Sequence, residues 1–429
     1  MLDIRRHVLK LRLLDERRRL APRAAPAKES GEEEWSMRSR YSRISQVEMI
    51  GAEGLDALHR SRVAILGVGN IGGEAGRHLA MLGVGVLLVD RDTVSAENLG
   101  TQGFTEDDLG LAKVEARARH LAALNPECRI ETLKADLEHL GLGALGEVNL
   151  IFCCLDSRRA RATVNELATR LGVPWVDAAI DGSGRSLFGR VAAYDPTSTG
   201  AACYLCPHDR ESLREIMREG REERCPVWRW DEREAVSTPT LAISALGAAV
   251  AAAQVVRGLK MLLGRRAEVS GREMYVDLDR GICSLHSLER NPHCLFDHRV
   301  LALTPFGRGA GEVTVEEMFA AAEKRLGREV RLRLHRRSIV TEARCPDCGA
   351  VKRPNRIFEA MRMEEATCEC GATMQPVAIG LLSRFGRAEA AEFLDHNWAE
   401  MGLPPRDVVT ASSGEAEVHF VLAESWRER

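Results

Sequence analysis

The stretch "AILGVGNIGGEAGRHLAMLGVGVLLVDRD", residues 64–92, decides the fold. An apolar run leads into a Gly-x-Gly-x-x-Gly turn at Gly67, Gly69 and Gly72, and a helical stretch then leads to a second apolar run that ends in Asp90. This order is typical of a nucleotide-binding turn, where glycine lets the backbone approach phosphate and a helix N-terminus faces the anion. The pattern predicts a nucleotide with its ribose on Asp90. It does not separate NAD from ATP, and a tight turn without any ligand has the same spacing.

Apolar β-rich runs alternate with amphipathic stretches on both sides of this turn, for example "VNLIFCCLD" (148–156) and "VPWVDAA" (173–179). The alternation predicts an α/β domain with a doubly wound, mainly parallel sheet over residues 36–300. Residues 1–35 predict a basic amphipathic helix and a linker; the helix packs on its own domain or on a second subunit, or serves as a docking arm. Residues 301–429 predict a small α+β domain that carries a zinc ribbon.

The composition is that of a globular protein with more than one domain, since 429 residues include 45% hydrophobic and 29% charged residues. A formal net charge of -3 argues against nucleic-acid binding through overall charge. Arg and Lys interrupt the apolar N-terminus, so we expect no secretory segment and a cytosolic protein. The apolar stretch 241–263 predicts a core or subunit-interface helix rather than a membrane span. Close cysteine pairs favour metal ligands or catalytic thiols over disulfides.

Later motifs continue the pattern. "VDRDTVSAENLGTQGFTEDDLGLAKVEA" (89–116) places Asn98, Gln102 and Lys113 after Asp90, and "IFCCLDSRRARATVN" (151–165) places Asp156 after a later strand. Over residues 38–298 the sequence resembles the ubiquitin-activating and ThiF/MoeB-type adenylyltransferase superfamily, which activates ubiquitin-like and sulfur-carrier proteins. The resemblance implies that ATP with Mg²⁺ occupies the site, and that the C-terminal glycine carboxylate of a small β-grasp protein attacks the α-phosphate to give an acyl-adenylate.

Roles for single residues follow from their motif positions. The resemblance implies that Asp90 holds the ribose, that Asn98 and Lys113 bind phosphates, and that Asp156 binds Mg²⁺. Arg43 would reach a phosphate of the neighbouring subunit in a homodimer. Cationic groups are needed because a carboxylate that attacks a triphosphate brings anion against anion. The expected nucleotide-binding residues are Gly67, Gly69, Gly72, Asp90, Asn98, Gln102, Lys113 and Asp156, and the expected catalytic residues are Cys225, Asp156, Lys113 and Arg43.

One motif departs from the family. The pattern Asn-Leu-x-Arg-Gln reads "NLGTQ" here (98–102), so Thr101 stands where a phosphate-binding arginine is expected. Threonine donates a hydrogen bond but carries no charge, and the loss of one such donor costs about 3 kcal/mol of transition-state stabilisation. Another arginine would have to substitute, and the sequence does not choose among the candidates Arg158, Arg159, Arg161 and Arg185.

Two groups of cysteines predict metal centres. Cys203 and Cys206 have Cys-x-x-Cys spacing, which suits tetrahedral zinc, and the matching later segment "ERNPHCLFDH" (289–298) keeps only Cys294. A site that has lost its metal is the alternative. The second group contains four cysteines in the C-terminal part and predicts a structural Zn²⁺ site that contributes folding free energy of order 10 kcal/mol. Free thiols or an iron centre are the alternatives for this group. Candidates for the fourth ligand of the first group are Asp297, His298 and His293; the second group is Cys345, Cys348, Cys368 and Cys370.

Cys225, in "GREERCPVW" (220–228), is the candidate nucleophile. The corresponding loop of the family often carries a thiol that takes the acyl group as a thioester or receives sulfur as a persulfide. Arg221 and Arg224 would lower the pKa of this thiol; an inert loop cysteine is the alternative. Cys153 and Cys154 lie in an apolar run and are expected in the core.

These expectations lead to one preferred function. We expect the chain to adenylate the C-terminal glycine of a ubiquitin-like protein, to form a thioester on Cys225 and to transfer the protein to a conjugating enzyme. Activation of a sulfur-carrier protein is the alternative within this class. A partner-binding module without catalysis, or an NAD-linked oxidoreductase, are the alternatives outside it. We expect a homodimer, and we expect neither nucleic acid nor membrane as a partner.

Overall fold

The computed structural model describes residues 40–181, 183–218 and 243–426. The helix and linker expected over residues 1–35 lie outside the described residues, and so does Cys225. Contacts divide the chain after Leu55 into two compact units. The described part of the first unit contains a 3-10 helix, η1 (Ile44–Gln46), and the start of α3 (Gly51–Arg60).

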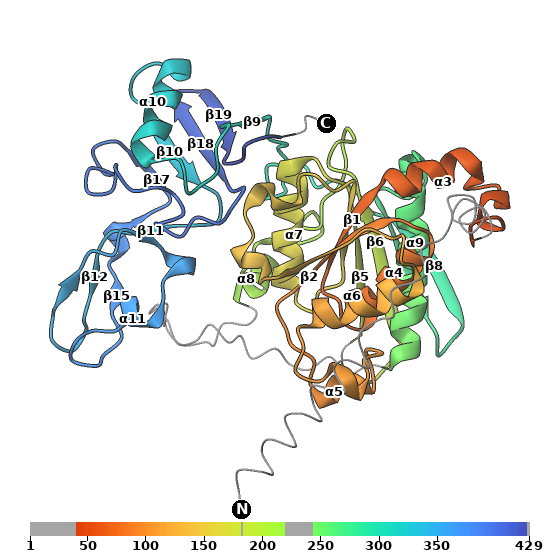
Figure 1. Cartoon of the computed structure of the whole chain (residues 1–429). Helices are drawn as coiled ribbons and strands as arrows, with labels where there is room; N and C mark the ends of the chain where they lie inside the picture. The colour runs from red at the N-terminus through yellow and green to blue at the C-terminus, as the bar shows by residue number, and fades with distance from the viewer. Residues whose placement is uncertain (1–39, 182, 219–242, 427–429) are drawn as a thin grey trace, which may run out of the picture. The chain divides into compact units, whose positions relative to one another are not determined.

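The main sheet has eight strands in the order β3-β2-β1-β4-β5-β6-β7-β8 (Figure 1). Strands β3, β2, β1, β4 and β5 pair in parallel, and β6, β7 and β8 continue the sheet antiparallel. The central strands are continuous apolar runs because both of their faces are covered. The sheet confirms the predicted doubly wound, mainly parallel α/β fold. Its strands are β1 (Arg62–Leu66), β2 (Gly85–Asp90), β3 (Ile130–Lys134), β4 (Leu150–Cys153), β5 (Trp175–Ile180), β6 (Phe188–Tyr194), β7 (Arg272–Asp277) and β8 (Ile282–Ser287).

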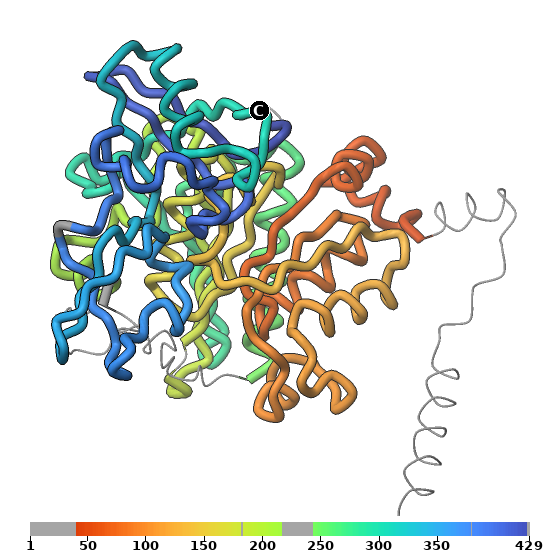
Figure 2. Tube along the Cα trace, turned by 60° about the vertical axis from the view of Figure 1, so that its left-hand side comes forward, coloured from red at the N-terminus to blue at the C-terminus, as the bar shows by residue number. Residues whose placement is uncertain are grey.

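Helices cover both faces of this sheet (Figure 1). One face carries α4 (Asn70–Met81), α6 (Lys113–Leu124) and α9 (Ser244–Leu262); the other carries α7 (Arg158–Leu171) and α8 (Arg210–Arg218). Figure 2 follows the same trace from another side. β1 and β4 are neighbouring strands, and the helices that follow them, α4 and α7, therefore lie on opposite faces of the sheet. The short helices nearby are α5 (Ala96–Leu99), η2 (Glu106–Asp108), η3 (Leu137–His139), η4 (Leu142–Leu145) and η5 (Arg266–Glu268).

Helix α9 is long and apolar enough to cross a membrane by length and composition alone. In the structure it packs against α4 and against strands β4, β5 and β6. Its fully buried Gln254 donates hydrogen bonds to the carbonyls of Cys153 and Val176 at 3.2 and 2.9 Å. These contacts are those of a core helix, as the sequence predicts for this stretch.

The C-terminal part has a sheet of its own, in the order β17-β10-β18-β19-β9, covered by α10 (Val315–Leu326). A capping box between Thr314 and Glu317 starts α10. Two three-stranded sheets lie between β10 and β17 in the sequence, as expected for an α+β part with a cysteine knuckle; the boundary near residue 300 stays a prediction. The remaining elements are β9 (Leu303–Pro305), β10 (Arg331–Leu334), β11 (Ile339–Val340), β12 (Ala343–Arg344), β13 (Val351–Lys352), β14 (Arg356–Ile357), η6 (Phe358–Ala360), α11 (Met363–Ala366), β15 (Gln375–Pro376), η7 (Ala378–Gly380), β16 (Leu381–Leu382), β17 (Arg384–Gly386), β18 (Val408–Ser413) and β19 (Ala416–Val421).

A buried ion pair joins the C-terminal sheet to η4. Asp407 accepts hydrogen bonds from the Leu142 N–H and from Arg337 Nε, both at 2.7 Å, and Arg337 Nη2 donates to the Leu140 carbonyl at 2.8 Å. The side chains of Asp407 and Arg337 are each only 2% exposed. Gly146 adds a close approach, because a Cβ there would lie 1.8 Å from the Trp426 ring.

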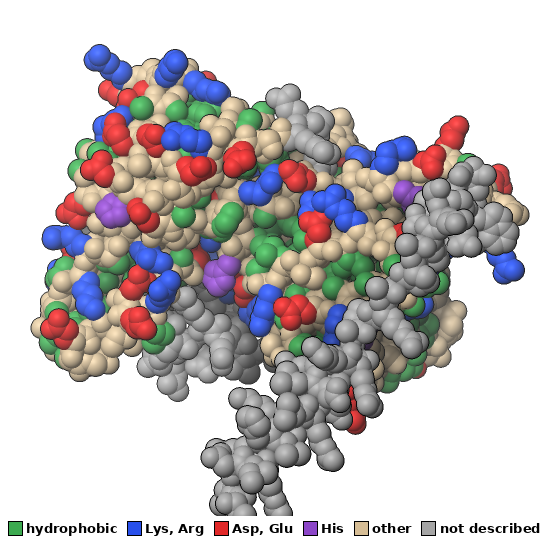
Figure 3. All heavy atoms as spheres, in the orientation of Figure 1, with side chains coloured by type: hydrophobic (Ala, Val, Ile, Leu, Met, Phe, Trp, Pro, Cys, Tyr) green, Lys and Arg blue, Asp and Glu red, His purple; other side chains and the backbone are tan. Residues whose placement is uncertain are grey.

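The surface shows a mixed charge pattern. On the face drawn in Figure 3, acidic and basic side chains are interspersed over the described residues.

We predict that Asp407→Ala lowers the free energy of unfolding by about 3 to 5 kcal/mol, because it leaves a buried guanidinium without its counter-charge. The matched control is Glu147→Ala, which removes a half-exposed ion pair with Arg406 at the same junction and should cost about 1 kcal/mol or less. Urea unfolding of both variants measures the difference. Equal losses in the two variants would contradict the importance of the buried pair.

Candidate functional site

The glycine turn connects β1 to α4 and leaves no room for side chains. A Cβ on Gly72 would lie 1.9 Å from the Gly67 carbonyl oxygen. Gly67 has φ +85° and its own Cβ would meet the Cys154 carbonyl oxygen at 2.8 Å, so this position needs glycine for its backbone as well as for space. The first N–H groups of α4 lie at the positive end of the helix directly after this turn, and their role in binding phosphate stays a prediction.

Asp90, at the end of β2, is hydrogen-bonded to this turn. Its Oδ2 accepts from the Val68 N–H at 2.8 Å, and its Oδ1 accepts from the Asp92 N–H at 2.9 Å. Burial raises the pKa of the Asp90 carboxyl above its ordinary value. The structure therefore holds this carboxylate beside the glycines, where its remaining lone pairs suit a ribose hydroxyl; that role stays a prediction.

Lys113 is the first residue of α6 and is only 7% exposed. Its Nζ lies 3.0 Å from Asp92 Oδ2, and its backbone N–H donates to the Asp92 carbonyl at 2.9 Å. Sequence reasoning missed Asp92 as the residue that holds this lysine; the signal was a second acid two residues after Asp90 in the quoted stretch. A buried lysine with an exposed carboxylate partner is a cation that a stronger anion can take over.

Asn98 and Gln102 lie on the segment between β2 and α6. Asn98 is 7% exposed, and its Oδ1 accepts from the Ser95 N–H and hydroxyl at 3.0 and 3.1 Å, so this side chain caps α5. The Gln102 amide covers Gly69, where a Cβ would lie 3.2 Å from Gln102 Oε1. Gln102 Oε1 is buried without a hydrogen-bond partner among the described residues. An unsatisfied amide against the glycine turn fits a site for a polar ligand.

Asp156 follows β4, and its side chain is exposed. Strands β1 and β4 are parallel neighbours whose chains continue to opposite faces of the sheet. Ligands of doubly wound sheets bind at the carboxyl ends of such a strand pair. The glycine turn and Asp156 both lie there. A carboxylate that keeps access to water suits Mg²⁺, which binds oxygen ligands and retains several waters, and this role stays a prediction for Asp156.

Two further predicted residues are not placed relative to this site. Arg43 lies in the first unit, directly before η1, where its carbonyl accepts from the Gln46 N–H at 3.3 Å. Cys225 lies outside the described residues. Their predicted roles are neither supported nor contradicted by the geometry.

The four arginines that are candidates to substitute for the arginine missing at Thr101 have other partners or surroundings. Arg161 Nε lies 3.1 Å from the fully buried Asp177, and Arg159 pairs with Glu138. Arg158 lies 3.9 Å from Glu215, and Arg185 is exposed.

A different arginine, missed in the sequence, reaches the turn. Arg117 Nη2 donates to the Gln102 carbonyl at 2.6 Å and to the Val68 carbonyl at 3.4 Å. The only signal for it was its position one helical turn after Lys113.

The first cysteine group is completed by a histidine. The ligand atoms of Cys203, Cys206, Cys294 and His298 all lie within 4.8 Å of one another. Cys203 Sγ to Cys294 Sγ is 3.9 Å and Cys206 Sγ to His298 Nε2 is 3.6 Å. These separations suit four ligands around one Zn²⁺, given Zn–S bonds of about 2.3 Å.

The geometry groups neither Asp297 nor His293 with the three cysteines, and the fourth ligand stays a prediction, for which it favours His298. The Asp297 carboxylate points to Arg170, whose Nη1 lies 2.5 Å away, and it also accepts from the Arg299 N–H at 3.0 Å. His293 is not among the grouped ligands; its N–H donates to the Asn291 side chain at 2.8 Å.

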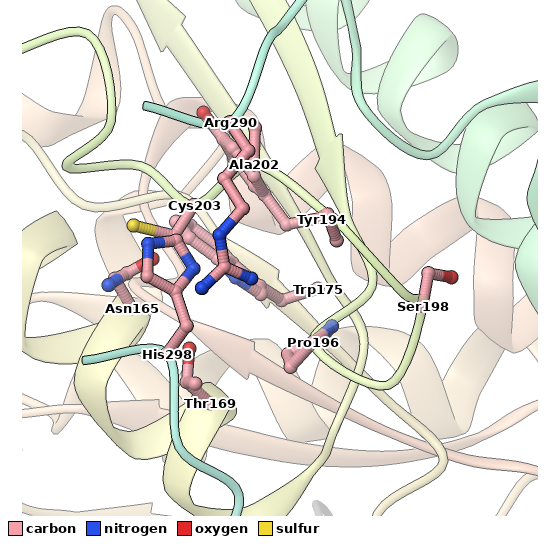
Figure 4. A pocket seen from close by; sticks show the side chains of 11 residues that line it. Asn165, Thr169, Trp175, Tyr194, Pro196, Ser198, Ala202, Cys203, Arg290 and His298 are labelled. Carbon is pink, nitrogen blue, oxygen red and sulfur yellow. The ribbon is translucent and has the colours of Figure 1, made fainter. Parts of the chain in front are cut away.

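A small cavity of about 20 Å³ adjoins this group (Figure 4). Figure 4 shows Cys203, His298, Asn165 and Trp175 around it. Asn165 Nδ2 and Trp175 Nε1 are buried without partners among the described residues, so the cavity is polar. This volume holds about one water molecule and excludes a nucleotide.

The second cysteine group lies on two turns of the C-terminal part. Cys345 Sγ to Cys370 Sγ and Cys348 Sγ to Cys368 Sγ are both 3.5 Å, and all four sulfurs lie within 4.8 Å of one another. Each pair is followed by a glycine with positive φ, Gly349 and Gly371. Four thiolates in this arrangement leave no open coordination position and fit a structural Zn²⁺ site.

We predict that the purified chain binds two equivalents of Zn²⁺ and that His298→Ala loses one of them, because an alanine leaves the first group with three ligands. Asp297→Ala is the matched neighbouring control and should retain both equivalents. Elemental analysis of each variant after dialysis gives the count. Loss of zinc from the Asp297 variant instead would overturn the ligand assignment.

Comparisons with known proteins show which family the chain belongs to. A model of the ThiF family matches residues 41–296. Ubiquitin-like modifier-activating enzyme 5 of Culex quinquefasciatus is 28% identical over 181 residues, and that of Drosophila persimilis is 30% identical over 184. Each match covers 39% of this chain and 45% or 47% of the relative, so the chain spans less than half the length of these relatives. A structure of E. coli MccB with ATP is 21% identical, with a TM-score of 0.46 over 60% of this chain and 73% of that chain. The match to the family model covers more than half of the sequence, and the chain belongs to the ThiF family.

Proposed function

We propose that this protein uses ATP and Mg²⁺ to adenylate the C-terminal glycine of a ubiquitin-like protein. The observation that carries the proposal is Lys113, a buried cation held by Asp92 beside the glycine turn. Hydride transfer to a nicotinamide needs neither a phosphate-directed lysine nor a metal-directed acid such as Asp156. A reaction between two anions needs both.

In this reaction a carboxylate oxygen of the carrier protein attacks the α-phosphorus of ATP. The bond from the α-phosphorus to the bridging oxygen breaks, and pyrophosphate leaves with that electron pair. The N-terminus of α4 binds phosphate oxygens, Lys113 shifts from Asp92 toward the developing charge, and Asp90 orients the ribose. Bound to Asp156, Mg²⁺ would supply further positive charge to the phosphates.

The finer steps of the proposal extend beyond the described residues. The Cys225 thiolate attacks the acyl carbon of the adenylate, AMP leaves, and the thioester passes to a conjugating enzyme. Activation of a sulfur carrier for thiolation chemistry is the alternative fate of the same adenylate. The proposal also includes a cytosolic homodimer in which Arg43 reaches the partner's phosphate.

Thr101 favours a second candidate function. With threonine in place of the phosphate-binding arginine, a chain without a substitute cation would bind nucleotide and carrier without reacting them. Such a module would bind ATP and give no exchange of pyrophosphate into ATP.

We predict that Asp156→Ala lowers carrier-dependent ATP–pyrophosphate exchange by about 100-fold or more, because the phosphates lose a metal-directed carboxylate. The probe is a small β-grasp protein that ends in glycine. The control is Asp395→Ala, which removes an exposed carboxylate in the C-terminal part and should leave exchange unchanged. Exchange that persists in the Asp156 variant would refute this role, and exchange absent from the wild-type chain would favour the binding module.

We predict that Cys225→Ala keeps ATP–pyrophosphate exchange, because adenylation precedes attack by the thiol. The same variant should lose the adduct with the carrier protein that is seen on non-reducing gels and removed by reductant. Cys283→Ala, at an exposed cysteine of β8, is the control and should keep the adduct. An adduct that survives in the Cys225 variant would show that the acyl group is carried elsewhere.

A further inference from the structure

Arg117 is a buried cation against the back of the glycine turn. It lies on α6 one helical turn after Lys113, and its guanidinium bridges the carbonyls of Val68 and Gln102. Gly73 makes room for it, since a Cβ there would lie 2.4 Å from Arg117 Nη2. The fold thus contains a space in α4 that this one side chain fills.

The charge of Arg117 has no direct counter-charge in the part of the chain that the structure describes. No carboxylate of those residues lies within ion-pair distance of its guanidinium, which is 6% exposed and lies 4.3 Å from the centre of the Phe104 ring. Its Nε is also unpartnered among these residues. Burial lowers the pKa of Arg117 to about 10, and the carboxylates of Glu74, Asp108 and Asp90 oppose this effect from beyond ion-pair distance, so the side chain stays protonated at neutral pH. A buried cation of this kind is costly until an anion binds nearby.

Arg117 lies close to Thr101, the position where the family pattern has an arginine. Gln102, whose carbonyl Arg117 binds, is the residue directly after Thr101. Val68, whose carbonyl it also contacts, lies between two glycines of the turn. Arg117 is thereby tied to both segments that would surround the phosphates, whereas Arg161, a candidate from the sequence, is neutralised by Asp177.

We propose that Arg117 supplies the positive charge that Thr101 does not, and that it acts from behind the glycine turn. Arg117 is a positioning residue: it fixes the Val68 and Gln102 backbones, and its charge, which no carboxylate of the described residues contacts directly, favours a polyanionic ligand over a neutral one. The inference rests on the proposed function, because it takes the triphosphate of ATP as the anion.

The test compares binding of ATP and of adenosine to the full-length chain by calorimetry. Arg117→Gln should weaken ATP binding at least about tenfold, because one positive charge beside the turn is lost, and should weaken adenosine binding much less. Arg117→Lys, which keeps the charge, should lose less than Arg117→Gln. Adding Thr101→Arg to the Arg117→Gln chain should restore ATP affinity, because it returns a cation to the turn at the position where the family pattern has its arginine. The control is Arg119→Gln, two residues away on α6, which removes an exposed arginine paired with Asp108.

Several outcomes would overturn the proposal. Equal loss of ATP and adenosine affinity, or no rescue by Thr101→Arg, would show a purely structural role. If Arg117→Gln does not fold, the single variant Thr101→Arg tests the proposal instead. A gain in ATP affinity of about tenfold or more in that variant would show that Arg117 does not replace the charge of the family's arginine. If the wild-type chain binds ATP but shows no pyrophosphate exchange, the proposed adenylation is contradicted. The role of Arg117 can still be tested in that case, because its test measures ATP binding.

Discussion

The close approach between β1 and α4 is the constraint on which the candidate site depends. Gly72 lies so near the Gly67 carbonyl that a single added carbon would sit 1.9 Å from its oxygen. This contact starts α4 directly at the end of β1 and turns its free N–H groups toward the carboxyl edge of the sheet. Three side chains then contact the turn. Asp90 accepts from the Val68 N–H, Gln102 lies over Gly69, and Arg117 donates to the Val68 carbonyl.

Charge around the turn is distributed unevenly, and this distribution suits an anionic ligand. Lys113 is paired with the half-exposed Asp92, while Arg117 has only carbonyls and an aromatic ring as partners. The carboxylates of Asp90 and Asp156 differ as well: Asp90 is held by two backbone N–H groups, and Asp156 is exposed after β4. A triphosphate and a peptide carboxylate can meet in such a site because its cations offset their repulsion.

The cysteine groups and the C-terminal part serve a different purpose. Both groups offer four closed ligands, which is the arrangement of structural rather than catalytic zinc. The buried Asp407 and Arg337 pair then ties the C-terminal sheet to the segment between β3 and β4. The candidate nucleotide site and the two metal groups thus consist of separate residues.

The sequence by itself determined the features that depend on local spacing. The glycine pattern, the alternation of apolar runs and the paired cysteines predict the sheet, the turn and both metal groups, because residues a few positions apart share one element or one turn. Only the tertiary structure decided which distant groups meet. It places His298 rather than Asp297 beside the cysteines, since Arg170, over a hundred residues earlier, pairs with that carboxylate. It also brought Arg117 into the space left by Gly73, because which face of α6 packs on α4 is set by the whole core and not by the neighbours of Arg117 in the sequence.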